Sequence, residues 1–388
     1  MSSLKKKIKT TATDYMDSIR HICAKRAEIR KYEDARRKAI YESITLTVEQ
    51  KHEIDDLYVK NYGSKIPYTW HQHFTAFTRN FDPAYIPETL YIPEFEHYMN
   101  LDKSYVHVFE DKNVLSRIAG WGGVKTPEIV LTCICGIFQD TEGREIPIVD
   151  VISFLSDTGE AFAKPSVESG SGRGCTLVCF QNGIDILSGK SVQEILVSLG
   201  NNFVIQKRIH CHESISTIYA ESVNTFRVIT YRWKDKYYHM PITMRIGQGG
   251  KYLDNAHAGG MFIAIDDDGT LHKTARTEFK TEYTAHPDTG VVFDGYKIDL
   301  LPNVIEAAER MCLMVPQVGS INWDFTIGAD GSPIVIEANM EGGSIWLSEM
   351  AHGCSPFGER TSEVLRWINL MKRTPASQRY KYQFGKME

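Results

Sequence analysis

Three side chains near the C-terminus could bind a metal ion through oxygen. The stretch INWDFTIGADGSPIVIEAN, residues 321–339, is typical of two strands joined by a turn over 329–332, with Asp324 on the first strand and Glu337 and Asn339 on the second. Glu337 and Asn339 are two residues apart, so a strand directs both side chains to the same face. Hard oxygen ligands suit Mg²⁺, which binds through one or two carboxylates together with nucleotide phosphates. The alternative, for this stretch alone, is a surface hairpin with solvated acids.

A second group of residues could bind phosphate. A predicted strand ends at Lys164, which offers a cation, and a loop rich in glycine and serine follows. That loop includes Ser169, Gly170, Ser171 and Gly172. Its backbone N–H groups can approach phosphate oxygens closely because glycine has no side chain. A flexible surface turn explains the loop alone equally well.

A third segment could contact a nucleotide base and its ribose. The run FVIQKRI, residues 203–209, is apolar and then polar, and Glu213 follows it. Such a run could lie along the edge of an adenine base and place Glu213 on the ribose hydroxyls. The neighbouring His210, Cys211 and His212 form a local cluster, but two ligands from one strand do not make a metal site.

Periodicity predicts the elements that position these residues. Residues 1–60 are rich in Lys, Arg, Glu and Ala with apolar residues at helical spacing, and residues 61–100 are aromatic and contain proline, as in a compact, short-helical segment. The runs YVHVFE at 105–110, IVLTCICGIF at 129–138 and IPIVDVISFL at 146–155 predict strands.

Later signals predict further helices and one hairpin. Ser191 with Glu194, three residues on, forms a capping box that begins a helix. The same reasoning predicts a hairpin over 261–272 and helices over 302–314 and 362–371. The basic tail after Arg373 is expected to fray.

Composition excludes several classes of protein. The 388 residues allow two or three domains, and the hydrophobic share of 42% and charged share of 24% are typical of a soluble globular protein. A net charge of −5 does not favour nucleic acid or an anionic membrane as partner. No apolar run approaches the roughly 18 residues of a membrane span, and MSSLKKKIKT lacks the apolar core of a secretion signal. Eight cysteines without a CxxC pair indicate reduced thiols and a cytoplasmic location.

In order and spacing, these motifs resemble those of the ATP-grasp superfamily. The order is Asp111-Lys112, Gly123-x-x-x-Pro127, Lys164-Pro165 with the Gly-rich loop, Gln206 with Glu213 seven residues on, and Asp324 with Glu337-x-Asn339. The last two spacings are similar to those of D-alanine–D-alanine ligases. The chain is most similar to the sugar-transfer-associated ATP-grasp group, through SVNTFR at 222–227, Asp254-Asn255 with Gly259-Gly260, and YIPETLYIPEF at 85–95. The similarity runs from about residue 60 to residue 350.

The resemblance implies an α+β fold in which two α+β subdomains clasp ATP, preceded by a helical, aromatic-rich N-terminal region. The expected limits are 1–104 for that region, 105–206 for the first subdomain with the Gly-rich loop, 207–372 for the second subdomain with the metal site, and 373–388 for the basic tail. A helical N-terminal region departs from the small βαβ unit of typical members.

The resemblance also implies roles at the nucleotide. Lys112 corresponds to a lysine on the α-phosphate side, and Lys164 to the second nucleotide lysine, at the end of the strand that carries the loop. The residues expected at adenine and ribose are Gln206, Lys207, Ile209 and Glu213. The loop of Ser169, Gly170, Ser171 and Gly172 is expected to close over the nucleotide.

The implied metal site holds two Mg²⁺ ions, with Mn²⁺ as an alternative, on Asp324, Glu337 and Asn339. The ligases have an arginine two residues before the first metal aspartate, where this chain has Asn322. Arg227 and Arg245 are the candidates to supply that charge in catalysis, and a structural ion pair is the alternative for each.

The implied activity is an ATP-dependent carboxylate–amine ligase that forms an amide through an acylphosphate. Its expected partners are a small-molecule carboxylate and amine, with a sugar or glycan as a further acceptor, and oligomer formation is left open. The association with sugar transfer implies polysaccharide or glycoconjugate biosynthesis. The alternatives are a small-molecule or sugar kinase with the same nucleotide site, and a nucleotide-binding protein without turnover. Met340–Trp346, MEGGSIW, is expected to line the acceptor side because it follows the metal ligands.

Overall fold

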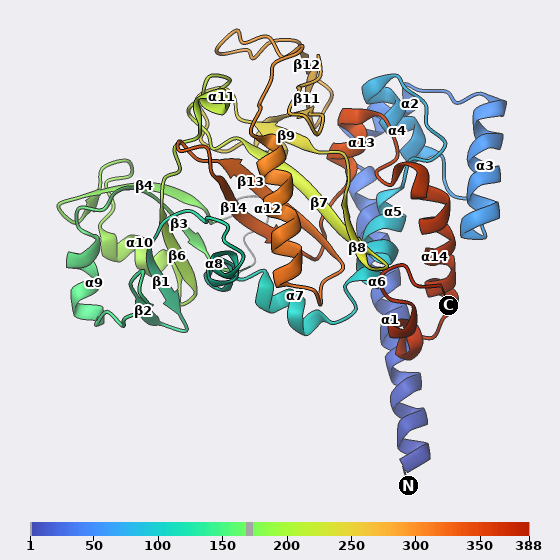
Figure 1. The fold of residues 1–388 in the computed structure, drawn as a ribbon, viewed down its shortest axis with the longest axis horizontal. Coiled ribbons are helices and arrows are strands. Elements are labelled where there is room, and N and C mark those ends of the chain that lie inside the picture. Colours follow the sequence, from blue (N-terminus) through green and yellow to red (C-terminus); the bar gives the residue numbers. More distant parts are fainter. Residues whose placement is uncertain (1, 168–173, 388) are drawn as a thin grey trace.

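The structure, a computed structural model, describes residues 2–167 and 174–387. Its described part has a six-stranded sheet at one end, an eight-stranded sheet in the middle, and a group of helices from both ends of the chain at the other end (Figure 1). Across the described ranges, no helix is both long enough and apolar enough to cross a membrane.

The first sheet is antiparallel, and its described strands run in the order β2-β1-β6-β3-β4-β5. Its strands and helices are β1 (Ile129–Ile134), β2 (Ile137–Gln139), α9 (Ile148–Leu155), β3 (Gly159–Pro165), β4 (Thr176–Gln181), β5 (Ile184–Asp185), α10 (Val192–Leu199) and β6 (Phe203–Lys207). The predicted capping box is confirmed, because the Ser191 hydroxyl accepts from the Glu194 N–H and the Glu194 carboxylate accepts from the Ser191 N–H. The central strands β3 and β6 pair, and they carry Lys164 and Gln206.

The second sheet is also antiparallel, with β13 between β7 and β14. Its strands are β7 (Thr225–Trp233), β8 (Lys236–His239), β9 (Thr243–Ile246), β10 (Met261–Ala264), β11 (Ala275–Thr277), β12 (Glu282–Tyr283), β13 (Ser320–Ile327) and β14 (Pro333–Asn339). The helices and short turns beside it are α7 (Lys103–Phe109), α8 (Lys112–Trp121), α11 (Glu213–Ser216), η3 (Ala256–Ala258) and α12 (Leu301–Met314). The predicted acidic hairpin, the hairpin over 261–272 and the helix over 302–314 are confirmed.

Both faces of the second sheet are covered, and alternate residues of β7 show how. Phe226 and Val228 pack with α12 and α8 in one core, whereas Ile229, Tyr231 and Trp233 pack in a second core with helices from both ends of the chain. The helices of that second core are α3 (Val48–Tyr62), α5 (Glu88–Leu90), η1 (Tyr91–Glu96), α6 (His97–Met99) and α14 (Thr361–Arg373), with η5 (Ala376–Tyr382) packed against it. A third core joins the end of α1 (Ser2–Tyr32) to α2 (Ala35–Glu42), α4 (Thr69–Thr78) and α13 (Trp346–His352), and η4 (Gly358–Arg360) precedes α14 in the chain. The predicted helical N-terminal region and last helix are therefore confirmed.

Two predicted strands are helices, and both corrections have the same physical reason. YVHVFE belongs to α7, where the Asp102 side chain accepts from the Ser104 N–H and the rings of Tyr105 and Phe109 stack one turn apart, with centroids separated by 5.9 Å. IPIVDVISFL contains α9, in which burial falls on Val151 and Leu155, four residues apart. In α9 the buried side chains recur at helical spacing, and in α7 the buried Val106 and the partly buried Phe109 are three residues apart, which is also helical rather than alternating spacing.

The tail after Arg373 does not fray. It continues as η5, where the Arg379 guanidinium is buried and donates to Asp17 of α1 at 2.6 Å. The predicted domain limits stay predictions, although the buried side chains of α7 and α8 belong to the core of the second sheet rather than the first.

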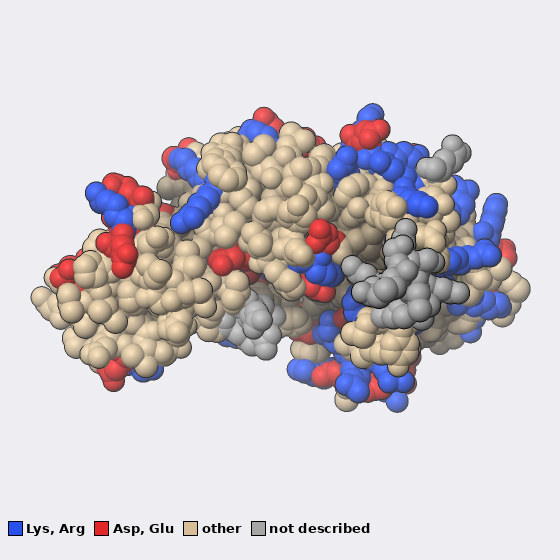
Figure 2. All heavy atoms as spheres, turned by 90° about the horizontal axis from the view of Figure 1, so that it is seen from below, with Lys and Arg blue, Asp and Glu red and all other residues tan. Residues whose placement is uncertain are grey.

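Charged side chains are spread unevenly over one face of the molecule. Seen from below, Lys and Arg gather over the helical end, whereas the end formed by the first sheet is mostly uncharged (Figure 2). The two ends therefore present different surfaces to solvent on this face.

Candidate active site

One cavity of about 350 Å³ brings together most of the predicted site residues from both sheets. The predicted residues that line it are Lys112, Lys164, Gln206, Lys207, Ile209, Arg227, Arg245, Asp324, Glu337 and Asn339. A cavity of this size is within the range of small-molecule sites in proteins. These residues come from several separate stretches of the sequence, so the tertiary fold brings them together in one cavity.

The acidic hairpin holds its three oxygen-bearing side chains on one face. In the register of β13 with β14, Asp324 is opposite Glu337 and Asn322 is opposite Asn339. Trp323 and Ala338, between them, are buried in the core on the other face of the hairpin. Alternation along both strands therefore places Asp324, Glu337 and Asn339 toward the cavity, as the sequence predicted.

Asp324 lies between the two candidate arginines. Arg227, its cross-strand neighbour on β7, donates from Nε and Nη2 to the two carboxylate oxygens at 2.7 and 3.3 Å. Arg245 of β9 forms an ion pair from Nη2 at 3.0 Å. Burial raises the pKa of Asp324, but the two guanidinium groups lower it by more, and the pKa lies below its ordinary value. A buried, ionised carboxylate is stable here because both neighbours are cations.

Arg245 has further partners that sequence reasoning missed. Its Nε and Nη2 donate to the Thr225 hydroxyl at 2.8 and 2.7 Å, and that hydroxyl in turn donates to Asp254. Asp254 is 8% exposed, and burial raises its pKa although Arg245 lowers it. The Asp254-Asn255 motif was visible in the sequence, but its place beside Arg245 depends on the pairing of β7 with β9.

Two lysines extend the charged part of the cavity toward the first sheet. Lys112 begins α8 and forms an ion pair with Glu337, with Nζ and Oε1 2.8 Å apart. Lys164, on β3, is 8% exposed, and its burial lowers the pKa of its ammonium group. Both cations thus lie near Glu337 of the hairpin, and lysine ammonium groups are of the kind that binds phosphate oxygens.

The part of the cavity formed by the first sheet suits a purine base. Gln206 is 3% exposed, and its Oε1 is buried without a hydrogen-bond partner. Phe162 and Ile336 contribute apolar surface to the same cavity, and Ile209 lies where the chain leaves β6. Lys207 also lines the cavity, and its ammonium pairs with Glu128 at 2.6 Å. An unpartnered amide oxygen beside apolar walls fits an amino group on a flat ring, such as the adenine amine.

The cavity does not account for five of the residues predicted to bind the nucleotide. Glu213 is exposed at the first position of α11 and does not line the cavity. The loop residues Ser169, Gly170, Ser171 and Gly172 lie outside the described residues. Their predicted roles stay predictions.

Three glutamates upstream of the first sheet hold the segment that follows the metal ligands. Glu110 accepts from the N–H groups of Met340 and Glu341 at 2.6 and 2.9 Å, and Glu96 accepts from Gly342 and Gly343 at 2.8 and 2.7 Å. The third carboxylate, Glu88, accepts from the N–H groups of Ile345 and Trp346 at 2.9 and 2.8 Å and from the hydroxyl of Ser344. The segment 340–346 therefore takes its shape from carboxylates on another part of the chain.

This segment forms one wall of the cavity, and its predicted place on the acceptor side stays a prediction. Glu341, Gly342, Gly343, Ser344 and Trp346 all line the cavity. A Cβ on Gly343 would lie 2.5 Å from Nδ2 of Asn322, so glycine is required at this close approach. The sequence signal for Glu88 and Glu96 was available, because acids within the aromatic stretch YIPETLYIPEFE are candidates for buried, hydrogen-bonded side chains, whereas Glu110 lies outside that stretch.

The donor set fits the predicted metal ion. Asp324 and Glu337 offer carboxylate oxygens and Asn339 an amide oxygen on one face, which is the ligand chemistry of Mg²⁺. Arg227 and Arg245 occupy part of the Asp324 carboxylate, so a metal ion would use its remaining lone pairs. Lys112 contacts Oε1 of Glu337, which leaves the second oxygen of Glu337 for the ion.

Comparison with known proteins shows the family of this chain. The sequence model of a family described as sugar-transfer-associated ATP-grasp matches residues 93–364. No curated protein matches the chain.

Several solved structures are similar over part of the chain. A D-alanine–D-alanine ligase from Bacillus anthracis is 15% identical over 69% of this chain and 69% of its own, with a TM-score of 0.37. The ADP complex of N5-carboxyaminoimidazole ribonucleotide synthetase is 13% identical over 61% of this chain and 45% of its own, with a TM-score of 0.36. An L-amino acid ligase from Bacillus licheniformis is 13% identical over 61% and 41%, with a TM-score of 0.33. The chain spans under half of the last two, and likenesses this distant say nothing of the substrate.

Replacement of Asp324 should show how far the fold depends on this charge. Asp324→Asn keeps the shape but leaves Arg227 without a carboxylate and Arg245 with Asp254 alone, so we expect the free energy of unfolding to fall by about 3 kcal/mol. Urea unfolding measures the change. Asp330→Asn is the matched control, because Asp330 lies on the same hairpin in an exposed pair with Lys125 and should change stability little. Equal midpoints for Asp324→Asn and the natural protein would contradict the prediction.

The burial of Glu96 predicts that the free energy of unfolding depends on pH. Burial raises the pKa of Glu96 to about 8, against its hydrogen bonds from Gly342 and Gly343. The folded state then binds a proton that the unfolded state releases above its ordinary pKa of 4.5, so the contribution of Glu96 to the free energy of unfolding falls as pH rises from 4.5 to 8. Relative to the natural protein, Glu96→Gln should gain stability over this range, by on the order of 1.4 kcal/mol per pH unit.

Urea unfolding of both proteins at three pH values between 5 and 9 tests this. Buried histidines titrate alike in the two proteins, so they cancel in the difference. A difference in unfolding free energy that stays constant with pH would show that Glu96 does not titrate as expected.

Proposed function

Because the chain belongs to the sugar-transfer-associated ATP-grasp family and has its fold, we propose that it uses ATP to join a carboxylate to an amine. The family match confirms the predicted superfamily. The observation that carries the proposal is the cavity in which Lys164 and Gln206 of the first sheet meet Lys112 of α8 and the acids, amide and arginines of the second sheet, namely Asp324, Glu337, Asn339, Arg227 and Arg245. Fold alone does not determine the reaction, so the argument rests on these side chains.

The proposed reaction has two steps. A substrate carboxylate oxygen attacks the γ-phosphorus of ATP, the bond to the β-phosphate oxygen breaks, and an acylphosphate and ADP result. The amine nitrogen then attacks the acyl carbon, phosphate leaves with the C–O bonding electrons, and the amine loses a proton. Positioning and charge neutralisation account for most of the catalysis of phosphoryl transfer. Cations, acids and an amide in one cavity supply both.

Each side chain has a role in this reaction. Gln206 and the backbone near Ile209 would bind adenine, and Lys112 and Lys164 would neutralise phosphate oxygens. Arg227 and Arg245 would stabilise the charge that develops between the γ-phosphate and the attacking carboxylate. Their bonds to Asp324 support this role, because a guanidinium held by a buried carboxylate is already oriented before substrate arrives.

Asp324, Glu337 and Asn339 would hold the magnesium. Bound there, Mg²⁺ would neutralise charge on the β- and γ-phosphates, and Mn²⁺ could replace it. That the site holds two ions is part of the proposal. The cytoplasmic location and the link to polysaccharide or glycoconjugate biosynthesis also stay proposals, the latter supported by the family's association with sugar transfer.

A second cavity, next to the first, could bind the acceptor. It measures about 170 Å³ and shares His257, Ser344 and Trp346 with the first cavity. Three of its polar atoms are buried without a hydrogen-bond partner, namely Tyr32 Oη, His73 Nδ1 and Glu88 Oε2. A buried polar group costs about 1–3 kcal/mol when it is unpaired, so such atoms are usually bonded to a ligand or to water. We propose that polar groups of the acceptor, a sugar or an amine, enter this cavity.

The first test measures ADP release from Mg·ATP with a panel of uronic acids and amino acids, with hydroxylamine as the amine. We expect ADP formation that depends on one acid, with trapped hydroxamate, because the acylphosphate is open to any amine. ADP with a stable phosphorylated product and no hydroxamate would replace the ligase with a kinase. No turnover with any acid would overturn the proposal of a small carboxylate substrate.

Glu337→Ala should abolish ATP turnover while the fold survives. Glu337 binds metal in the proposal, and its side chain is partly exposed to the cavity rather than packed in a core. The steady-state rate of ADP formation measures the loss, and circular dichroism checks the fold. Lys125→Ala is a suitable control, since Lys125 pairs with Asp330 at the turn of the same hairpin outside the cavity. Normal turnover in Glu337→Ala would remove it from the metal site.

Tyr32→Phe should raise the KM of the acceptor about three- to tenfold and leave the KM of ATP unchanged. The hydroxyl of Tyr32 has no partner within the protein, so its loss should not weaken the fold. Tyr41→Phe is the control, because its ring stacks on Tyr32 but does not line the cavity. An unchanged acceptor KM in Tyr32→Phe would place the acceptor elsewhere.

A further inference from the structure

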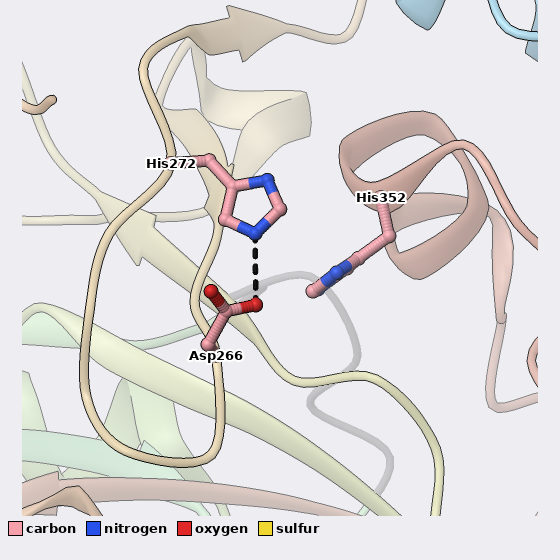
Figure 3. A group of neighbouring side chains, drawn as sticks. All are labelled: Asp266, His272 and His352. Carbon is pink, nitrogen blue, oxygen red and sulfur yellow. Dashed lines mark hydrogen bonds and ion pairs between the residues drawn. The ribbon is translucent and has the colours of Figure 1, made fainter. Parts of the chain in front are cut away.

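A group of three side chains outside the candidate active site has the composition of a transition-metal site (Figure 3). Asp266 and His272 lie on the hairpin that follows β10, and His352 is the last residue of α13. One ligand atom from each residue lies within 4.8 Å of those of the other two. The residues come from segments about 80 positions apart, so the tertiary fold brings them together.

The hairpin places Asp266 and His272 on one face. Ile265 pairs with Leu271, the Asp266 N–H donates to Thr270, and the His272 N–H donates to Ala264. Asp266 and His272 are therefore diagonal cross-strand neighbours with side chains on the same side. Asp266 Oδ1 and His272 Nε2 are 2.9 Å apart. Two ligand atoms on a tetrahedral ion, each about 2.0–2.1 Å from it, are about 3.3 Å apart, so a small adjustment would admit an ion between them.

One ring nitrogen of His352 is engaged by a hydrogen bond to the backbone. Its Nε2 donates to the carbonyl oxygen of Ile242 at 2.7 Å, because a carbonyl can only accept. That bond leaves Nδ1 with a lone pair and keeps the ring in one tautomer. A histidine that donates its second ring N–H to a backbone carbonyl is the usual arrangement at protein metal ions.

We propose that Asp266, His272 and His352 bind one Zn²⁺ ion. Two imidazole nitrogens and one carboxylate oxygen suit zinc, and three protein ligands leave a fourth position for water. Asp266 and His352 border an open hollow, so the fourth position faces solvent. The site does not depend on the proposed ligase activity, because none of its three residues lines the ATP cavity.

Zinc here would join two elements that otherwise meet through side-chain packing. His352 ends α13, and Trp346 and Leu347 at the start of the same helix line the candidate active site. An ion that links the end of α13 to the hairpin would therefore make the backbone hydrogen bonds of α13 break less often. This helix forms part of the cavity wall. Hydrogen exchange of the α13 amides should slow when zinc binds.

Titration of the full-length protein with Zn²⁺ by calorimetry, after treatment with a chelator, tests the proposal. We expect one equivalent to bind, with a rise in the unfolding temperature. Co²⁺ in place of Zn²⁺ should give visible absorption bands of a tetrahedral ion. His272→Ala should weaken binding by at least about tenfold, the size of loss seen even for outer partners of metal ligands. His272 is half exposed on a hairpin, so this variant should fold, and His352→Ala should show the same loss.

Two controls exclude other zinc sites. His239→Ala removes another imidazole that borders the same hollow, and Glu337→Gln alters the proposed Mg²⁺ site; both should bind zinc as the natural protein does. Absence of zinc binding at 100 µM, on the order of a hundred times the dissociation constant expected of such a site, would overturn the proposal. Equal loss in His239→Ala and His272→Ala, or no loss in His272→Ala, would do so as well.

Discussion

Three carboxylates hold the wall of the candidate active site, and much of the architecture follows from that interaction. Glu88, Glu96 and Glu110 accept hydrogen bonds from six backbone N–H groups between residues 340 and 346. The carboxylates precede the first sheet in the chain, whereas the amides follow the last strand of the second. Buried backbone donors must be satisfied, so neither part can take its place without the other. The N-terminal helices are thus part of the site rather than an addition to it.

The sequence was sufficient for most of the fold, because strands and helices with a single buried face leave a clear period. The acidic hairpin and the helix at 302–314 are of this kind. Residues 105–110 and 146–155 misled the same reasoning, since short apolar runs satisfy both periods and the partner surface decides between them. For residues 105–110 that partner is the core of the second sheet, which lies far away in sequence.

The site was predictable where one motif carries its own geometry, and unpredictable where tertiary pairing sets it. Glu337 and Asn339 share a face because strands alternate, and Lys164 ends a strand that the sequence marks clearly. The partnership of Arg245 with Asp254 and the unpaired oxygen of Gln206 depend on which strands pair and what covers them. No local pattern encodes such cross-sheet neighbours.

The ion pair between Lys112 and Glu337 has a consequence for the order in which ligands can bind. A cation that takes Glu337 must compete with an ammonium group 2.8 Å away, which lowers the affinity of the acid for any metal ion alone. If the chain binds a nucleotide as proposed, a phosphate would replace Glu337 at that ammonium group and would free the carboxylate for the metal. By linkage, each ligand would then strengthen the binding of the other, and metal and nucleotide would enter together more readily than either alone.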